Sequence, residues 1–122
     1  VCFSVMEPSS FSNVEEKWVP EIKQYMPNVP FILVGTQTDL RDNLAAVKEL
    51  NKKRQKPVSK EEGEKMARRL GARCYIECSA LMNMNVKQVF DTAIITYFQP
   101  SRPKKNRFRK LLCGWNRSSE LL

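Results

Sequence analysis

Short apolar runs and longer polar, periodic stretches alternate along this chain. The apolar runs lie at residues 1–5, 31–34 and 74–78. The run at 31–34 is too short for an ordinary helix, lacks alternation and is rich in β-branched and aromatic types, which is typical of a strand buried on both faces of a parallel sheet. Three strand–helix alternations predict an α/β fold with three parallel strands and flanking helices.

A helix is predicted between the first two strands. Ser12 with Glu15 three residues later forms a capping box, in which the two side chains satisfy backbone donors at a helix start. Pro20 predicts a kink or a break, because proline removes one helical hydrogen bond. Apolar residues at helical spacing predict the face that packs on the sheet: Trp18, Ile22 and Tyr25 or Met26.

Two further helices are predicted in the second half of the chain. Ser59 and Glu62 repeat the capping box, and Gly71 suits a left-handed helix end. The inner face between them is expected at Met66, Ala67 and Leu70. The last helix has the clearest periodicity in the chain, carried by Val86, Val89, Phe90, Ala93, Ile94 and Tyr97.

The apolar run 31–34 ends at Gly35 and is followed by a polar turn that contains Asp39. Ligands of parallel sheets bind at the carboxyl ends of the strands. A carboxylate there accepts hydrogen bonds from the N1–H and 2-amino groups of guanine, which adenine does not match, and an unpaired buried group costs roughly 1–3 kcal/mol. Asp39 is therefore a candidate for recognising guanine, and the alternative is a capping or turn aspartate.

A second polar turn, Ser79-Ala80-Leu81, follows the strand at 74–78. Small residues directly after a strand let backbone N–H groups approach a ligand closely. The Ala80 amide is thus expected to donate to the O6 atom of a guanine held by Asp39. Taken alone, a Ser-Ala pair after a strand is usually a helix entrance.

The net charge of +8 is unevenly distributed. Residues 101–122 hold seven basic side chains against one acid, Glu120, and so supply +6 of that total. The remaining residues are nearly balanced, so no nucleic-acid-binding face is expected. We predict a folded domain at residues 1–98 and a basic, flexible tail at residues 99–122.

Residues 43–55 are highly charged, with a thin apolar stripe at Leu44, Val47 and Leu50. This pattern predicts a helix that forms a surface lobe and adds nothing to the core. A solvated helix and a partner-binding face fit the pattern equally well.

Four cysteines without a histidine predict neither a disulfide framework nor a zinc site, which favours a reducing, cytosolic setting. No apolar run approaches the length of a membrane span. The chain begins inside a strand-like run, without Met or a signal peptide, so we expect a fragment whose N-terminal portion is missing and whose apolar edge at residues 1–5 is open.

Residues 35–40 (Gly-Thr-Gln-Thr-Asp-Leu) and 77–81 (Glu-Cys-Ser-Ala-Leu) closely resemble the C-terminal half of a Rho-family small GTPase, nearest its Cdc42-like branch. The similarity extends over residues 1–98. The resemblance implies a three-layer, parallel-sheet P-loop GTPase fold, present here as a partial domain. Residues 43–55 match the insert helix that separates Rho proteins from other small GTPases, which favours the partner-binding interpretation.

The resemblance also implies roles for single residues. Asp39 would bind the guanine edge, the stem of Gln37 would pack over the ring, and Thr36 would support the neighbouring loops. Ser79 with Ala80 would make the O6 contact. The implied ligand is GTP or GDP, and the predicted nucleotide-binding residues are Thr36, Gln37, Asp39, Ser79, Ala80 and Leu81.

Two departures from the family pattern stand out. Residues 82–85 (Met-Asn-Met-Asn) replace the Thr, Gln, Lys and Gly that are usual there. No segment matches G-x-x-x-x-G-K-[ST], the phosphate-binding loop, and the switch segments that hold Mg²⁺ and orient water in the complete protein are absent. We therefore predict no catalytic residue and no metal ligand in this chain, and expect it alone neither to hydrolyse GTP nor to bind it tightly.

Residues 102–117 resemble the polybasic segment that draws Rho proteins to the cytoplasmic face of anionic membranes. A prenylation box would need cysteine at the position of Ser119. Cys113 lies among basic and apolar residues, a setting suited to palmitoylation, although an unmodified tail fits equally well.

Two functions follow from these observations. The first is a Rho-type signalling GTPase that, in complete form, binds and hydrolyses GTP and switches its binding of effector and regulator proteins at membranes. The second is a truncated, non-catalytic interaction module that acts through residues 43–55 and the basic tail. A flavodoxin-like domain is a more distant alternative, because it leaves two guanine motifs at successive strand ends unexplained.

Overall fold

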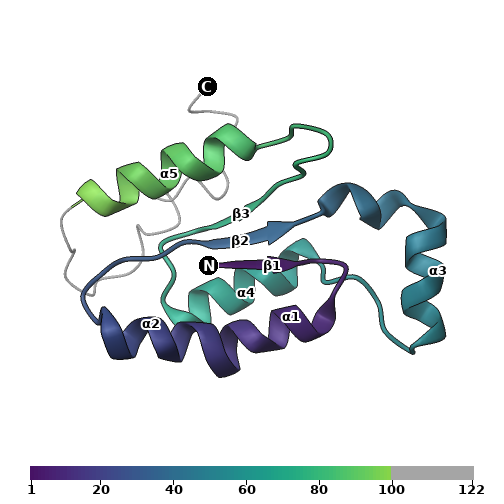
Figure 1. The fold of residues 1–122 in the computed structure, drawn as a ribbon, viewed down its shortest axis with the longest axis horizontal. Helices are drawn as coiled ribbons and strands as arrows, with labels where there is room; N and C mark the ends of the chain where they lie inside the picture. The colour runs from purple at the N-terminus through teal and green to yellow at the C-terminus, as the bar shows by residue number, and fades with distance from the viewer. Residues whose placement is uncertain (100–122) are drawn as a thin grey trace.

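A computed structural model describes residues 1–99 of the protein, so most of the predicted tail, with Cys113, lies outside the described residues. Three parallel strands form one sheet in the order β1-β2-β3 (Figure 1). The strands are β1 (Cys2–Ser4), β2 (Leu33–Thr36) and β3 (Tyr75–Glu77). The predicted parallel sheet is confirmed, although β2 begins two residues later than predicted and includes Gly35.

Helices cover both faces of this sheet, which makes three layers (Figure 1). One face carries α1 (Pro8–Asn13), η1 (Val14–Trp18), α2 (Val19–Tyr25) and α4 (Lys60–Leu70). The other face carries α5 (Val86–Phe98). Beyond the end of β2 lie the short helix η2 (Thr38–Asp42) and then α3 (Leu44–Lys52), which stands away from the sheet.

Each face of the sheet has its own core. On the side of α1, α2 and α4, the buried residues include Phe3, Val5, Val14, Val19, Leu33, Met66, Ala67 and Tyr75. On the side of α5, the buried residues are Ile32, Val34, Cys74, Ile76 and Cys78, with Val89 packed against them. Leu33 and Val34 are both buried, so β2 is covered on two faces, as its unbroken apolar run predicted.

The predicted start of the first helix is wrong. The helix begins at Pro8, and Ser12 lies inside it, where its hydroxyl donates to the Pro8 carbonyl at 3.3 Å. Proline is well placed in a first helical turn, because backbone N–H groups there have no helical acceptor. Glu15 does not cap the helix either, since it forms an ion pair with Arg69 of α4.

The predicted inner face of this helix is wrong at Trp18, Tyr25 and Met26, whereas Ile22 is partly buried, and a wide turn explains the difference. Residues 14–18 form a π-helical turn in which the Val19 N–H donates to the Val14 carbonyl, five residues back. This widening brings Val14 and Val19 to the sheet and turns Trp18, Tyr25 and Met26 outward, with 40%, 72% and 50% of their surfaces exposed. The wide turn ends at Trp18, two residues before Pro20, and the helix continues through Pro20 without the predicted break.

The remaining helices agree better with their predictions. Ser59 accepts a hydrogen bond from the Glu62 N–H at 3.2 Å, and Gly71 ends α4 in the left-handed conformation at φ 81°. Helix α3 lies within the predicted range 43–55, and Asn43 caps it by accepting from the Ala46 N–H at 3.1 Å. Helix α5 forms where predicted, but its large apolar side chains at Phe90, Ile94, Ile95, Tyr97 and Phe98 are exposed among the described residues.

Two glycines make room for the ring of Tyr75. A Cβ atom on Gly35 would overlap the Tyr75 hydroxyl, and one on Gly63 of α4 would overlap the ring itself. Gly35 therefore serves packing between β2 and β3 at this point. The Tyr75 hydroxyl in turn donates to Glu77 at 2.7 Å, directly beneath the polar turns at the end of the sheet.

We expect Gly35→Ala to destabilise the protein by about 1–3 kcal/mol, because the added methyl group meets the Tyr75 hydroxyl in a packed core. In the Tyr75→Phe background the same substitution should cost less, since the hydroxyl is gone. Gly63→Ala is the comparison, because its added methyl group meets ring carbons that phenylalanine keeps as well as the hydroxyl, so the relief there should be smaller. A double-mutant cycle by urea denaturation measures both, and equal relief at the two positions would contradict this packing.

Candidate functional site

The two polar turns predicted to bind a base lie side by side at the carboxyl edge of the sheet. The Cys78 N–H donates to the Gly35 carbonyl at 2.9 Å, which extends the β2–β3 pairing by one step. The Cys78 carbonyl then accepts from the Thr38 N–H at 3.4 Å and the Thr38 hydroxyl at 3.2 Å. Because Thr38 is buried, these bonds fix the position of the turn that contains Asp39 relative to the turn that contains Ser79.

Asp39 and Ser79 make the direct contact between the turns. The Ser79 hydroxyl donates to Asp39 Oδ1 at 2.7 Å and accepts the Met82 N–H at 3.1 Å. Ser79 is fully buried, whereas Asp39 is partly exposed. Asp39 Oδ2 accepts no hydrogen bond from residues 1–99. The bond at Oδ1 therefore orients the carboxylate, and Oδ2 is available to a ligand.

Of the pair expected at the O6 atom, the structure leaves Ala80 available. The Ser79 N–H is bonded to the Met84 carbonyl at 3.0 Å, and its hydroxyl is bonded to Asp39. The exposed Ala80 N–H donates to no atom of residues 1–99. Ser79 thus orients the Asp39 carboxylate. Ala80, the residue after Ser79, presents a free backbone N–H.

Thr36 and Gln37 are anchored to the first strand. The Thr36 hydroxyl donates to the Phe3 carbonyl of β1 at 3.1 Å. Gln37 is exposed and left-handed at φ 60°, and its Oε1 accepts from the Ser4 hydroxyl at 2.6 Å. Ser4 is a residue to which the sequence interpretation gave no role, because its partner is 33 positions away.

A second polar cluster lies behind the turns. Arg41 donates to both carboxylate oxygens of Glu77 at 2.6 Å and, through Nε and Nη2, to the Val58 carbonyl at 3.1 and 2.6 Å. The hydrogen bond to Glu77 raises the pKa of the Arg41 guanidinium. Burial raises the pKa of the Tyr75 hydroxyl, which donates to the same carboxylate. Sequence reasoning missed this cluster, in which three separate segments meet.

The loop between β3 and α5 is bonded to Ser79 and Glu77. Asn83 and Asn85 adopt positive φ values of 51° and 61°, a conformation that asparagine tolerates better than most residues. The Asn85 side chain donates to the Glu77 carbonyl at 2.9 Å. The residues that depart from the family pattern therefore support a defined loop, on which Leu81 is 81% exposed.

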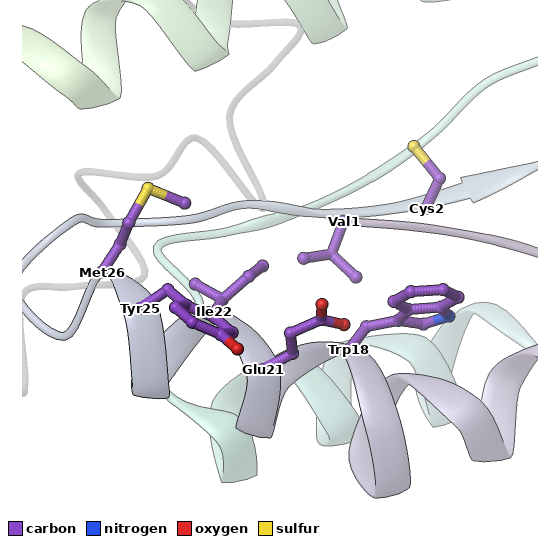
Figure 2. Close-up of a pocket in the computed structure, with 7 residues that line it drawn as sticks. All are labelled: Val1, Cys2, Trp18, Glu21, Ile22, Tyr25 and Met26. Atoms are coloured by element: carbon purple, nitrogen blue, oxygen red, sulfur yellow. The ribbon is translucent and has the colours of Figure 1, made fainter.

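A cavity of about 510 Å³ lies elsewhere, between β1 and α2 (Figure 2). Aromatic and apolar side chains and one carboxylate line it: Val1, Cys2, Trp18, Glu21, Ile22, Tyr25 and Met26. The Ser4 N–H donates to Ser10 Oγ at 3.0 Å, so the outer edge of β1 is already paired at that end. None of the predicted nucleotide-binding residues lines this cavity.

Residues 1–99 contain neither of two other kinds of site. No group of three or more His, Cys, Asp and Glu side chains is arranged to hold a metal ion there. None of the helices in that range is both long and apolar enough to cross a membrane.

Comparison with known protein families shows the family to which the chain belongs. The model of the Ras family matches residues 1–99. The chain therefore belongs to the Ras family, whose members are small GTPases that bind guanine nucleotides. The Asp39 carboxylate and the Ala80 N–H fit that class, because they offer an acceptor and a donor at one edge of the sheet.

We expect Thr38→Val to lower the free energy of unfolding by about 1 kcal/mol, because it removes a buried hydroxyl hydrogen bond to the Cys78 carbonyl while keeping the shape of the side chain. Ser9→Ala, at an exposed position on α1, is the control and should change little. Urea denaturation measures both, and equal stabilities would show that the Thr38 hydroxyl does not hold the two turns together.

Proposed function

We propose that this chain is the guanine-base-binding part of a Rho-type signalling GTPase, which in complete form binds GTP and GDP, hydrolyses GTP and switches its effector binding at membranes. The observation that carries this proposal is the hydrogen bond between Ser79 and Asp39. It joins the two turns in which a guanine motif was predicted and leaves one carboxylate oxygen available.

The contacts support guanine over adenine. The Asp39 carboxylate would accept from the N1–H and 2-amino groups, and the Ala80 N–H would donate to O6. Adenine has an acceptor at N1 and an amino group at C6, so both protein groups would lose their partners. Each charge-assisted hydrogen bond is worth about 1.5–3 kcal/mol, which makes this pair of turns strongly selective.

The stem of Gln37 would lie against the base. Its left-handed backbone is uncommon for a residue with a side chain, and the bond from Ser4 holds its amide back toward β1. That arrangement supports a flat contact made by the methylene groups. The phosphate contacts would come from a phosphate-binding loop, and the Mg²⁺ contacts and the positioning of water from switch segments, none of which these 122 residues include.

The charged segment at residues 43–55 supports the Rho assignment and a protein partner. Helix α3 within it stands beyond the sheet, and Leu44 at its start is 78% exposed. An apolar side chain on an otherwise charged lobe suits binding to effector or regulator proteins. The same lobe would serve the alternative function, an interaction module without nucleotide.

We expect Asp39→Ala in the intact protein to weaken GDP binding by at least about a hundredfold, because two charge-assisted hydrogen bonds are lost. Asp42→Ala is the matched control, since Asp42 is an exposed acid on the same helix η2, and it should leave affinity unchanged. Titration with fluorescent GDP measures both.

Two results would contradict the proposal. If Asp39→Ala bound GDP as tightly as the unchanged protein, the base would not lie on Asp39. If the intact protein bound no guanine nucleotide and still bound a partner through residues 43–55, the interaction module would be the correct function.

We further propose that the basic tail attaches the protein to anionic membranes, with Cys113 as its acylation site. Replacing Lys104, Lys105, Arg107 and Arg109 with Gln should release the protein from phosphatidylserine vesicles, because each basic residue contributes about 1 kcal/mol. The matched control replaces four basic residues of the charged lobe with Gln: Lys48, Lys52, Lys53 and Arg54. Equal loss of vesicle sedimentation in both variants would contradict a role specific to the tail.

A further inference from the structure

Arg41 lies in the same short helix as Asp39 but faces a different part of the protein. Its guanidinium makes a two-pronged contact with Glu77, which lies two residues before Ser79. Arg41 and Glu77 are mostly buried, with 24% and 14% of their side-chain surfaces exposed. A bidentate Arg–carboxylate contact restrains both distance and orientation, and partial burial limits its screening by water.

This contact is one of three that tie the two turns together. Asp39 is bonded to Ser79, Thr38 is bonded to Cys78, and Arg41 is bonded to Glu77. The first two act close to the available Asp39 oxygen. The third acts three residues further along helix η2 than Thr38 and so limits rotation of the helix about the Thr38 attachment.

Arg41 also reaches the segment that follows the charged lobe. Its Nη2 donates to the Val58 carbonyl at 2.6 Å, and the Val58 N–H donates to the Val5 carbonyl at 2.8 Å. Arg41 stands just before the lobe at residues 43–55, and Val58 stands just after it. One side chain therefore closes the base of the lobe and braces helix η2 against β3.

We propose that Arg41 is a positioning residue for guanine recognition, which holds the Asp39 carboxylate at the base through its contacts with Glu77 and the Val58 carbonyl. This inference rests on the proposed function of Asp39. Arg41 would not touch the base itself, so its loss should change how well the Asp39 carboxylate is aligned with the guanine. The 2-amino group of guanine, which hypoxanthine lacks, reports on that alignment.

The test compares GDP with IDP, the hypoxanthine nucleotide, on the intact protein. Arg41→Gln should reduce the preference for GDP over IDP about tenfold, which is the fold-change expected when one hydrogen bond to a carboxylate is lost. Arg69→Gln is the matched control, because it removes another ion pair between elements, to Glu15, away from the turns. It should leave the preference unchanged.

A second variant separates positioning from folding, because Arg41→Gln leaves Glu77 as a partly buried charge without its guanidinium. The double variant Arg41→Gln with Glu77→Gln removes both charges. It should regain thermal stability over the single variant and still show the reduced preference for GDP over IDP. Restored stability together with a restored preference would overturn the proposal, and so would equal weakening of GDP and IDP in both variants.

Asp39→Ala separates this inference from the function on which it rests. If Asp39→Ala abolishes the preference for GDP while the Arg41 variants keep it, the base site is correct and the positioning role of Arg41 is wrong. If Asp39→Ala leaves the preference intact, the proposed function of the site fails, and the inference about Arg41 fails with it.

Discussion

Parallel pairing of β2 with β3 brings Gly35 opposite Glu77, and the hydrogen bonds that join the two turns lie within about four residues of that pair. Parallel strands end on the same edge, so the turns after Thr36 and after Cys78 leave the sheet together. A shift of one residue along either strand would turn each side chain to the opposite face of the sheet and would separate Asp39 from Ser79. The register of two short strands therefore determines whether the site exists.

Packing beneath the site maintains that register. The Tyr75 ring fills the space left by two glycines, one on β2 and one on α4, and its hydroxyl meets Glu77. A side chain at either glycine would push β3 away from its neighbours. The polar bonds above, from Thr38 to Cys78 and from Ser79 to Asp39, then act between strand ends that are already aligned. Core packing sets the distance, and the buried hydrogen bonds set the orientation.

The part of the site that follows strand ends could be predicted from sequence. Asp39 and Ala80 stand where apolar runs stop, and the rule that parallel strands share a carboxyl edge brings them together. Arg41, Glu77 and Ser4 could not be predicted in the same way, because their partners are 17 to 36 positions distant and no local pattern marks them. The inner face of the first helix was predicted wrongly for a related reason. Its wide turn breaks the spacing of 3.6 residues on which face prediction relies.

The most direct test of this account is a crystal structure of the intact protein with GDP bound. We predict that the guanine N1–H and 2-amino groups lie within hydrogen-bond distance of Asp39 and that the Ala80 N–H faces O6. The Ser79 hydroxyl should still donate to Asp39 Oδ1. A base bound away from Asp39, for example in the cavity between β1 and α2, would contradict it.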